Sequence, residues 1–312
     1  MRFDFNAKGT AYFVDPKYHM MLHINYNWDP TGGEGRGDAI GRTFEAYFAY
    51  GDRRFVEAVK SCWVKVKTKN GYYYQGYRYP THKDNDMSRD HVFNTVLMLI
   101  ASGHFESEIR QFVTHIPWRI SDRYRQTLDF WLWTRAVSGI WWAKILSPIV
   151  EIPIMTITLL WQKFIYAITP FHQEMSQDEF AKIKDFKKTK RMKLLGSTLY
   201  PSYTMTQYAW RLYYAKNSLS KKILSWLLLK MANKHNYIVR MLLGDKVRPT
   251  AEQIFFYKTM MGGRWDGILN PEINDRDLHI ITKSRYPKDY DDMVKCNLLD
   301  VDLLRAVYKK TK

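Results

Sequence analysis

Ionisable side chains crowd one short stretch of the chain, from His82 to His91, directly before an apolar run. Asp86, Arg89, Asp90 and His91 stand within six residues of one another. Glycoside hydrolysis needs a pair of carboxyl groups, one as general acid and one as base or nucleophile. Imidazole is a further proton carrier, and a nearby arginine lowers the pKa of a carboxyl group. The stretch therefore predicts a catalytic site containing these four residues.

A helix is expected to position these groups. Apolar residues recur at helical spacing from Val92 to Ile100, and Ser88 precedes them as a candidate N-cap. The ionisable side chains would then gather at a helix N-terminus, where backbone N–H groups favour anions. Capping by Ser88 and Asp90 alone is the competing interpretation, because serine and aspartate are common at helix starts.

A second polar face is predicted on an αα-hairpin upstream. Asp38 is a candidate N-cap, Gly51 ends the first helix and Asp52 begins the second. Asp38, Arg42 and Glu45 fall on one face of the first helix, which lies toward either solvent or a polar cavity. We expect the two helix starts to share one concave site, with Asp38 as a further catalytic candidate.

Aromatic and charged side chains that suit a sugar-binding cleft occur in three further segments. These are the glycine-rich loops at 27–37 and 262–267 and the segment at 76–80. The candidate substrate-binding residues are Trp28, Arg42, Tyr77, Tyr79, Trp265 and Asp266. No metal or cofactor is predicted, since zinc spacing and the phosphate loop are missing from the sequence. Asp84, Asp86 and Asp90 could offer oxygen ligands to Ca²⁺, but the EF-hand pattern is missing. Cys62 falls on an apolar helix face, which argues against a cysteine nucleophile.

The elements around these residues are almost all helical. We expect a β-hairpin near 64–75 with a turn at Asn70-Gly71, then serial helical hairpins, including a long helix at 122–146. Residues 145–171 are the most apolar part of the chain. A buried helix pair is the preferred interpretation there, ahead of a membrane-inserting or partner-docking segment.

The charge of the chain favours acidic partners. The 312 residues carry a formal net charge of +17, concentrated partly in a basic stretch at 182–193. An acidic polysaccharide or protein assembly partners fit that charge. Nucleic-acid binding is not expected, because no DNA- or RNA-binding motif accompanies it. The N-terminus lacks the apolar run of a signal peptide, so we expect cytoplasmic synthesis and a cytoplasmic or virion-associated protein.

Three short motifs resemble segments of the (α/α) toroid, or six-hairpin glycosidase-like, proteins, in particular an uncharacterised branch of that class. They are Gly37–Thr43 followed by Tyr50-Gly51-Asp52, Asp86–His91, and Pro201–Trp210. The resemblance covers residues 27–265. It implies an all-α, toroid-like barrel of helical hairpins with a small β-hairpin. We expect residues 1–312 to form a single domain, with an apolar helical insert at about 137–171 and a C-terminal extension at about 268–312.

Two functions follow from this combination. The first is a carbohydrate-active enzyme, a glycoside hydrolase or polysaccharide lyase, acting on an acidic polysaccharide. The second is a non-enzymatic structural or docking protein of a large assembly such as a phage particle, because toroid scaffolds also serve without catalysis. In that case the clustered Asp and Arg residues form a buried ion network that fixes the helix starts.

Overall fold

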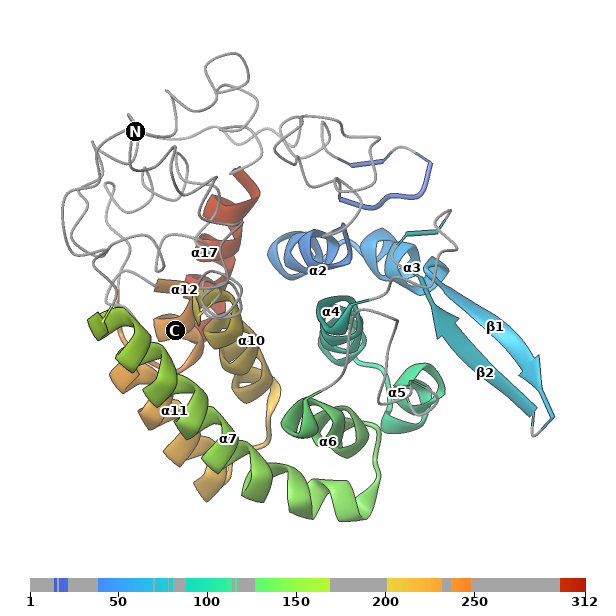
Figure 1. The fold of residues 1–312 in the computed structure, drawn as a ribbon. Helices are drawn as coiled ribbons and strands as arrows, with labels where there is room; N and C mark the ends of the chain where they lie inside the picture. The colour runs from blue at the N-terminus through green and yellow to red at the C-terminus, as the bar shows by residue number, and fades with distance from the viewer. Residues whose placement is uncertain are drawn as a thin grey trace. The chain divides into compact units, whose positions relative to one another are not determined.

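The structure, a computed structural model, describes residues 14–15, 17–21, 39–69, 71–77, 79–80, 88–113, 116, 127–168, 201–231, 237–247 and 298–312. This part of the chain is mostly helical, with one two-stranded antiparallel sheet (Figure 1). The chain divides into two compact units, Met1–Pro153 and Ile154–Lys312. The toroid arrangement and the single domain remain predictions.

The first unit opens with the expected αα-hairpin. Helix α2 (Ala39–Tyr50) is followed by α3 (Arg54–Ser61), and the two pack against each other. Gly51 ends α2 with φ of 73°, and its N–H donates to the Tyr47 carbonyl at 2.8 Å. The Asp52 carboxylate accepts the Arg54 backbone N–H at 2.9 Å at the start of α3. Gly51 therefore ends α2 as predicted, whereas Asp52 lies one residue before the N-cap of α3, which is Arg53.

The β-hairpin follows directly. Strand β1 (Trp63–Thr68) pairs with β2 (Gly71–Gly76), and Thr68 lies opposite Gly71. The strands are thus joined at residues 69–70, one residue earlier than the expected turn. Trp63 belongs to β1 and not to the apolar face of the preceding helix, because the chain leaves the helix at Cys62.

Helix α4 (Arg89–Ala101) provides the centre of this unit. Every side chain from His91 to Leu99 is buried, and α4 packs against α2, α3 and α5 (Glu106–Val113). Such all-round burial explains why the helix lacks a strongly polar face. The N-terminus of α4, where the sequence placed its catalytic residues, is therefore held by a rigid, packed element.

The prediction of one long helix at 122–146 is wrong for residues 127–146, where the structure has parts of two helices. Helix α6 (Leu128–Val137) has Ser138 as its C-cap and is followed by Gly139, and α7 (Trp141–Ile168) begins two residues after that glycine. Gly139 has φ of 84°, and the N–H groups of Gly139 and Ile140 donate back to the carbonyls of Ala136 and Arg135. This is the Schellman arrangement that terminates a helix at a left-handed glycine.

The prediction of a buried helix pair at 145–171 is also wrong for the residues that the structure describes, 145–168. Helix α7 is a single helix of 28 residues that continues through Pro148 and Pro153. Among the helices of the described ranges, none has both the length and the apolar character that crossing a membrane requires.

The second unit contains the C-terminal part of α7, from Ile154, and the remaining described helices. Helix α10 (Pro201–Tyr214) packs against α11 (Leu219–Met231) and α12 (Tyr237–Leu242), and α12 packs against α17 (Leu298–Thr311). Leu228, Val239 and Leu304 are among the fully buried side chains of this unit.

Candidate functional site

The N-terminus of α4 is built around a capping box. Ser88 is the N-cap, and its backbone N–H donates to Nδ1 of His91 at 2.9 Å. The Ser88 hydroxyl lies 3.0 Å from the same ring nitrogen. His91 occupies the position where Glu or Gln usually closes such a box. Both side chains are buried, so His91, a predicted proton carrier, is engaged in holding the helix start.

Arg89 and Asp90 remain accessible beside this cap. Their side chains are each about one-third exposed, and Arg89 Nε lies 3.9 Å from Asp90 Oδ1. Asp90 lies in the first turn of α4, where the helix dipole stabilises a negative charge. Of the predicted catalytic residues in the described ranges, Arg89 and Asp90 are the two with partly exposed side chains.

The polar face predicted on α2 is buried. Arg42 Nη1 donates to Glu45 Oε2 at 2.9 Å, and both side chains are less than 10% exposed. Of the two predicted environments for this face, solvent or a cavity, bulk solvent is therefore wrong for Arg42 and Glu45. Because a buried ion pair satisfies charges that would otherwise be costly, Arg42 and Glu45 fix each other in place.

The two tyrosines predicted to bind sugar lie in different environments. Tyr79 is fully buried, and its hydroxyl donates to the Asp15 carboxylate. Its ring therefore offers no face to a ligand and serves to anchor the 14–21 segment. Tyr77 is half-buried, and its backbone N–H donates to the Cys62 carbonyl at 2.7 Å.

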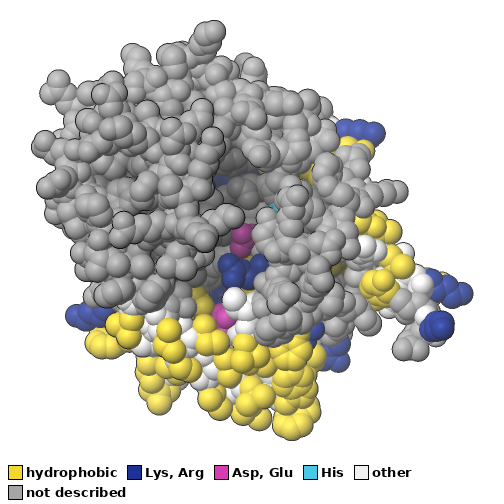
Figure 2. Space-filling view, in the orientation of Figure 1, with side chains coloured by type: hydrophobic (Ala, Val, Ile, Leu, Met, Phe, Trp, Pro, Cys, Tyr) yellow, Lys and Arg dark blue, Asp and Glu magenta, His cyan; other side chains and the backbone are white. Residues whose placement is uncertain are grey.

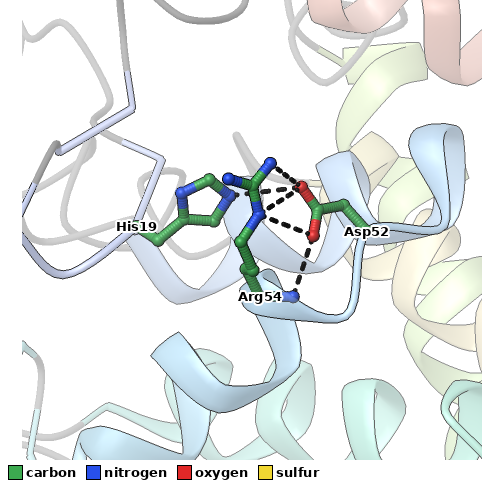
Figure 3. Close-up of polar contacts among 3 residues, drawn as sticks. All are labelled: His19, Asp52 and Arg54. Atoms are coloured by element: carbon green, nitrogen blue, oxygen red, sulfur yellow. Dashed lines mark hydrogen bonds and ion pairs between the residues drawn. The ribbon is translucent and has the colours of Figure 1, made fainter.

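A cluster that the sequence did not single out as a site lies at the start of α3. Asp52 accepts hydrogen bonds from the Arg54 guanidinium, and His19 Nε2 lies 3.4 Å from the Asp52 carboxylate (Figure 3). The hydrogen bonds from Arg54 lower the pKa of Asp52 to about 2. The His19 ring also packs against Phe55, with 4.6 Å between ring centroids. The cluster ties the 14–21 segment to α3.

Five of the predicted site residues lie outside the described residues: Asp38, Asp86, Trp28, Trp265 and Asp266. Whether Asp38 and Asp90 share one site stays a prediction. Within the described ranges, no group of three or more His, Cys, Asp and Glu side chains is placed to hold a metal ion. Cys62 is buried, and burial raises the pKa of its thiol, as expected for a residue without a nucleophilic role.

The most unusual surface feature of the described residues is on α7. Figure 2 shows hydrophobic side chains gathered where Figure 1 places this helix. The outward side chains are Trp141, Ile145, Leu146, Ile149, Ile157 and Leu160, which we call the apolar face of α7. Ile149 and Ile157 are 62% and 66% exposed. At 3.6 residues per turn these six positions fall on one side of the helix.

The opposite side of α7 carries polar groups into the interior. Ala143, Ser147, Glu151 and Met155 recur every four residues, and all four are buried. Ser147 and Glu151 are only 4% and 7% exposed. A helix on the surface of a globular protein normally buries its apolar stripe and exposes its polar one. In α7 an apolar stripe is exposed while Ser147 and Glu151 are buried, and this could not be predicted from periodicity because apolar residues occupy both sides of the helix.

No family model, curated protein or solved structure matches this chain.

Proposed function

We propose that this protein is a non-enzymatic structural or docking component of a large protein assembly, such as a phage particle. The apolar face of α7 is the surface that a partner subunit covers. The exposed apolar face of α7 carries the proposal, because contiguous exposed apolar side chains mark interaction sites in proteins.

The energy available to a partner is substantial. Complete burial of a large apolar side chain contributes about 1.5 to 3 kcal/mol. Six such side chains, each roughly half exposed, offer on the order of 5 to 10 kcal/mol before the costs of association are subtracted. Trp141, which is 72% exposed, is the type of residue that dominates binding at protein interfaces.

The electrostatics of this face favour a protein partner over a lipid surface. Lys144 lies beside Trp141 and Ile145, but its Nζ is bound to the Glu106 carboxylate at 2.7 and 2.9 Å. Helices that lie on membranes carry unpaired cations for the lipid headgroups. The centre of a protein interface is instead depleted of charge and rich in aromatic residues.

The buried polar groups support a structural role as well. Arg42 is paired with Glu45, and His91 closes the cap of α4. These side chains were predicted to bind or transform a substrate, yet their contacts hold helices in place. Clustered charged residues of this kind stabilise a fold as readily as they catalyse a reaction.

Site-specific photocrosslinking tests the proposal. A photoreactive amino acid replaces Ile149 or Ile157, and a matched control replaces Tyr72, which is 60% exposed on β2. We expect positions 149 and 157 to crosslink to the same protein subunit in producing cells, and position 72 not to. The double variant Ile149→Ser and Ile157→Ser should then no longer co-sediment with that subunit. Co-sedimentation equal to that of the wild type would refute the docking role of α7.

The carbohydrate-active enzyme is the second candidate, and the accessible Arg89–Asp90 pair at the N-terminus of α4 favours it. Asp90 would be one carboxyl group of the pair that hydrolysis needs, and Asp38 or Asp86 the other. Acidic and neutral polysaccharides are incubated with wild type and with Asp90→Asn, and reducing ends and ultraviolet absorbance are recorded. Cleavage that Asp90→Asn abolishes without unfolding would establish an enzyme. A wild type that cleaves none of them would count against one.

A further inference from the structure

A second exposed surface, on α11, differs in chemistry from the apolar face of α7. Its outward residues are Leu219, Lys222, Ile223, Trp226 and Lys230, which we call the basic-apolar face of α11. Each lies three or four residues from another member of the set, so all five lie on one side of the helix. Leu224 and Leu228 are buried on the other side, where α11 packs against α10. The helix is thus anchored to its own unit and presents this face outward.

We infer that the basic-apolar face of α11 is a contact site for an anionic lipid surface. Helices that lie in the membrane interface combine exposed Trp and Leu side chains with lysines. Trp226, at 59% exposed, is suited to the boundary between headgroups and acyl chains. Lys222 and Lys230 would meet the lipid phosphates from either end of the apolar side chains.

The charges on α11 are complementary to such a surface. The helix contains three lysines and no acidic residue. Lys221 donates to the Ala215 carbonyl at 2.8 Å, and burial lowers its pKa. Within the described ranges, Lys222 and Lys230 have no carboxylate partner. Both lysine side chains are exposed, as contact with an external anion requires.

The residue types favour lipid over an acidic protein. Protein interfaces are enriched in arginine and depleted of lysine, because the guanidinium group pairs with a carboxylate in a fixed geometry. Every cation on the basic-apolar face is a lysine, whose compact charge suits a fluid layer of headgroups. The face is independent of the proposed docking surface, since it belongs to another helix and attracts a different class of partner.

Vesicle co-sedimentation of the full chain tests this inference. The probes are vesicles of phosphatidylcholine with one-quarter phosphatidylglycerol, and vesicles of phosphatidylcholine alone. We expect binding to the anionic vesicles only. Each lysine near an anionic surface accounts for about a fivefold change in affinity, so Lys222→Glu with Lys230→Glu should weaken binding at least tenfold. Trp226→Ser should weaken it as well.

Matched controls separate this site from general basic charge. Lys65→Glu with Lys67→Glu removes the same charge from exposed positions on β1, and Tyr72→Ser removes an exposed ring from β2. We expect these variants to bind as the wild type does, with unchanged circular dichroism in all variants. If Lys65→Glu with Lys67→Glu weakens vesicle binding as much as the α11 double variant does, the inference is overturned. A wild type that does not bind anionic vesicles would also overturn it. Binding of the α11 face to polyglutamate, with none to vesicles, would replace lipid with an acidic protein.

Discussion

Replacement of Gly139 by alanine adds a single methyl group at the junction of α6 and α7. We expect it to lower the free energy of unfolding more than one added methyl group normally does. Gly139 has φ of 84°, a left-handed conformation that costs an L-residue roughly 1 to 2 kcal/mol. An added Cβ would also lie 2.6 Å from Glu106 Oε2 and 2.8 Å from Arg110 Nη2. Both side chains would have to move.

That movement breaks contacts between three helices. Glu106 holds Lys144 of α7, and the Arg110 Nε–H donates to the Ser138 carbonyl at 2.9 Å at the end of α6. A part-buried hydrogen bond and an exposed ion pair each contribute about 1 kcal/mol or less. The total expected loss for Gly139→Ala is therefore about 2 to 3 kcal/mol, of which roughly 1 kcal/mol comes from the displaced side chains.

Urea denaturation followed by circular dichroism measures this loss, and Gly103→Ala is the matched control. Gly103 has nearly the same conformation, with φ of 81°, but no atom lies within 4 Å of the added Cβ. The control should lose only the backbone contribution. If both variants unfold at the same urea concentration, or if Gly103→Ala is the less stable, the side-chain contacts around Gly139 do not contribute as argued.

Two further predictions concern the polar contacts of the first unit. His91→Ala should lower the melting temperature, because losing the cap costs about 1 kcal/mol or more of stability. His91→Gln should be more stable than His91→Ala, because a glutamine oxygen can accept the Ser88 N–H. Equal melting temperatures of the two variants would contradict the capping role. The pKa of Asp52 falls from 3.8 to about 2 on folding, mainly through hydrogen bonds from Arg54, so its ionised form stabilises the fold above about pH 4 and this contribution is lost as the pH falls toward 2. The stability advantage of wild type over Asp52→Asn, under about 1 kcal/mol because solvent screens the pair, should therefore disappear over that interval in acid titrations, and an advantage independent of pH would refute the assignment.

Local sequence determined much of the first unit. The pattern around Gly51 and Asp52 placed the αα-hairpin, because a left-handed glycine ends one helix and a carboxylate accepts the first N–H of the next. Ser88 marked the start of α4 for the same local reason. The turn of the β-hairpin was displaced by one residue, since pairing between the strands, and not the turn residues alone, sets the register.

The role of side chains at the predicted site depended on packing. Composition and spacing gathered Arg42, His91 and Tyr79 as binding or catalytic candidates. The structure buries all three: Arg42 in an ion pair with Glu45, Tyr79 against Asp15, and His91 in the cap of α4. Residue type alone cannot distinguish a ligand-facing histidine from a capping one, because both need the same hydrogen-bonding atoms.

The sequence by itself determined that 141–168 is rich in apolar residues and helical in pattern. It did not determine which side faces outward. Apolar residues occupy both sides of α7, so the periodicity that normally identifies the buried stripe is weak. Only the packing of α7 in the folded chain decides that Ser147 and Glu151 are covered while Ile149 and Ile157 are exposed. The exposure of the apolar residues creates the surface on which the proposed function rests.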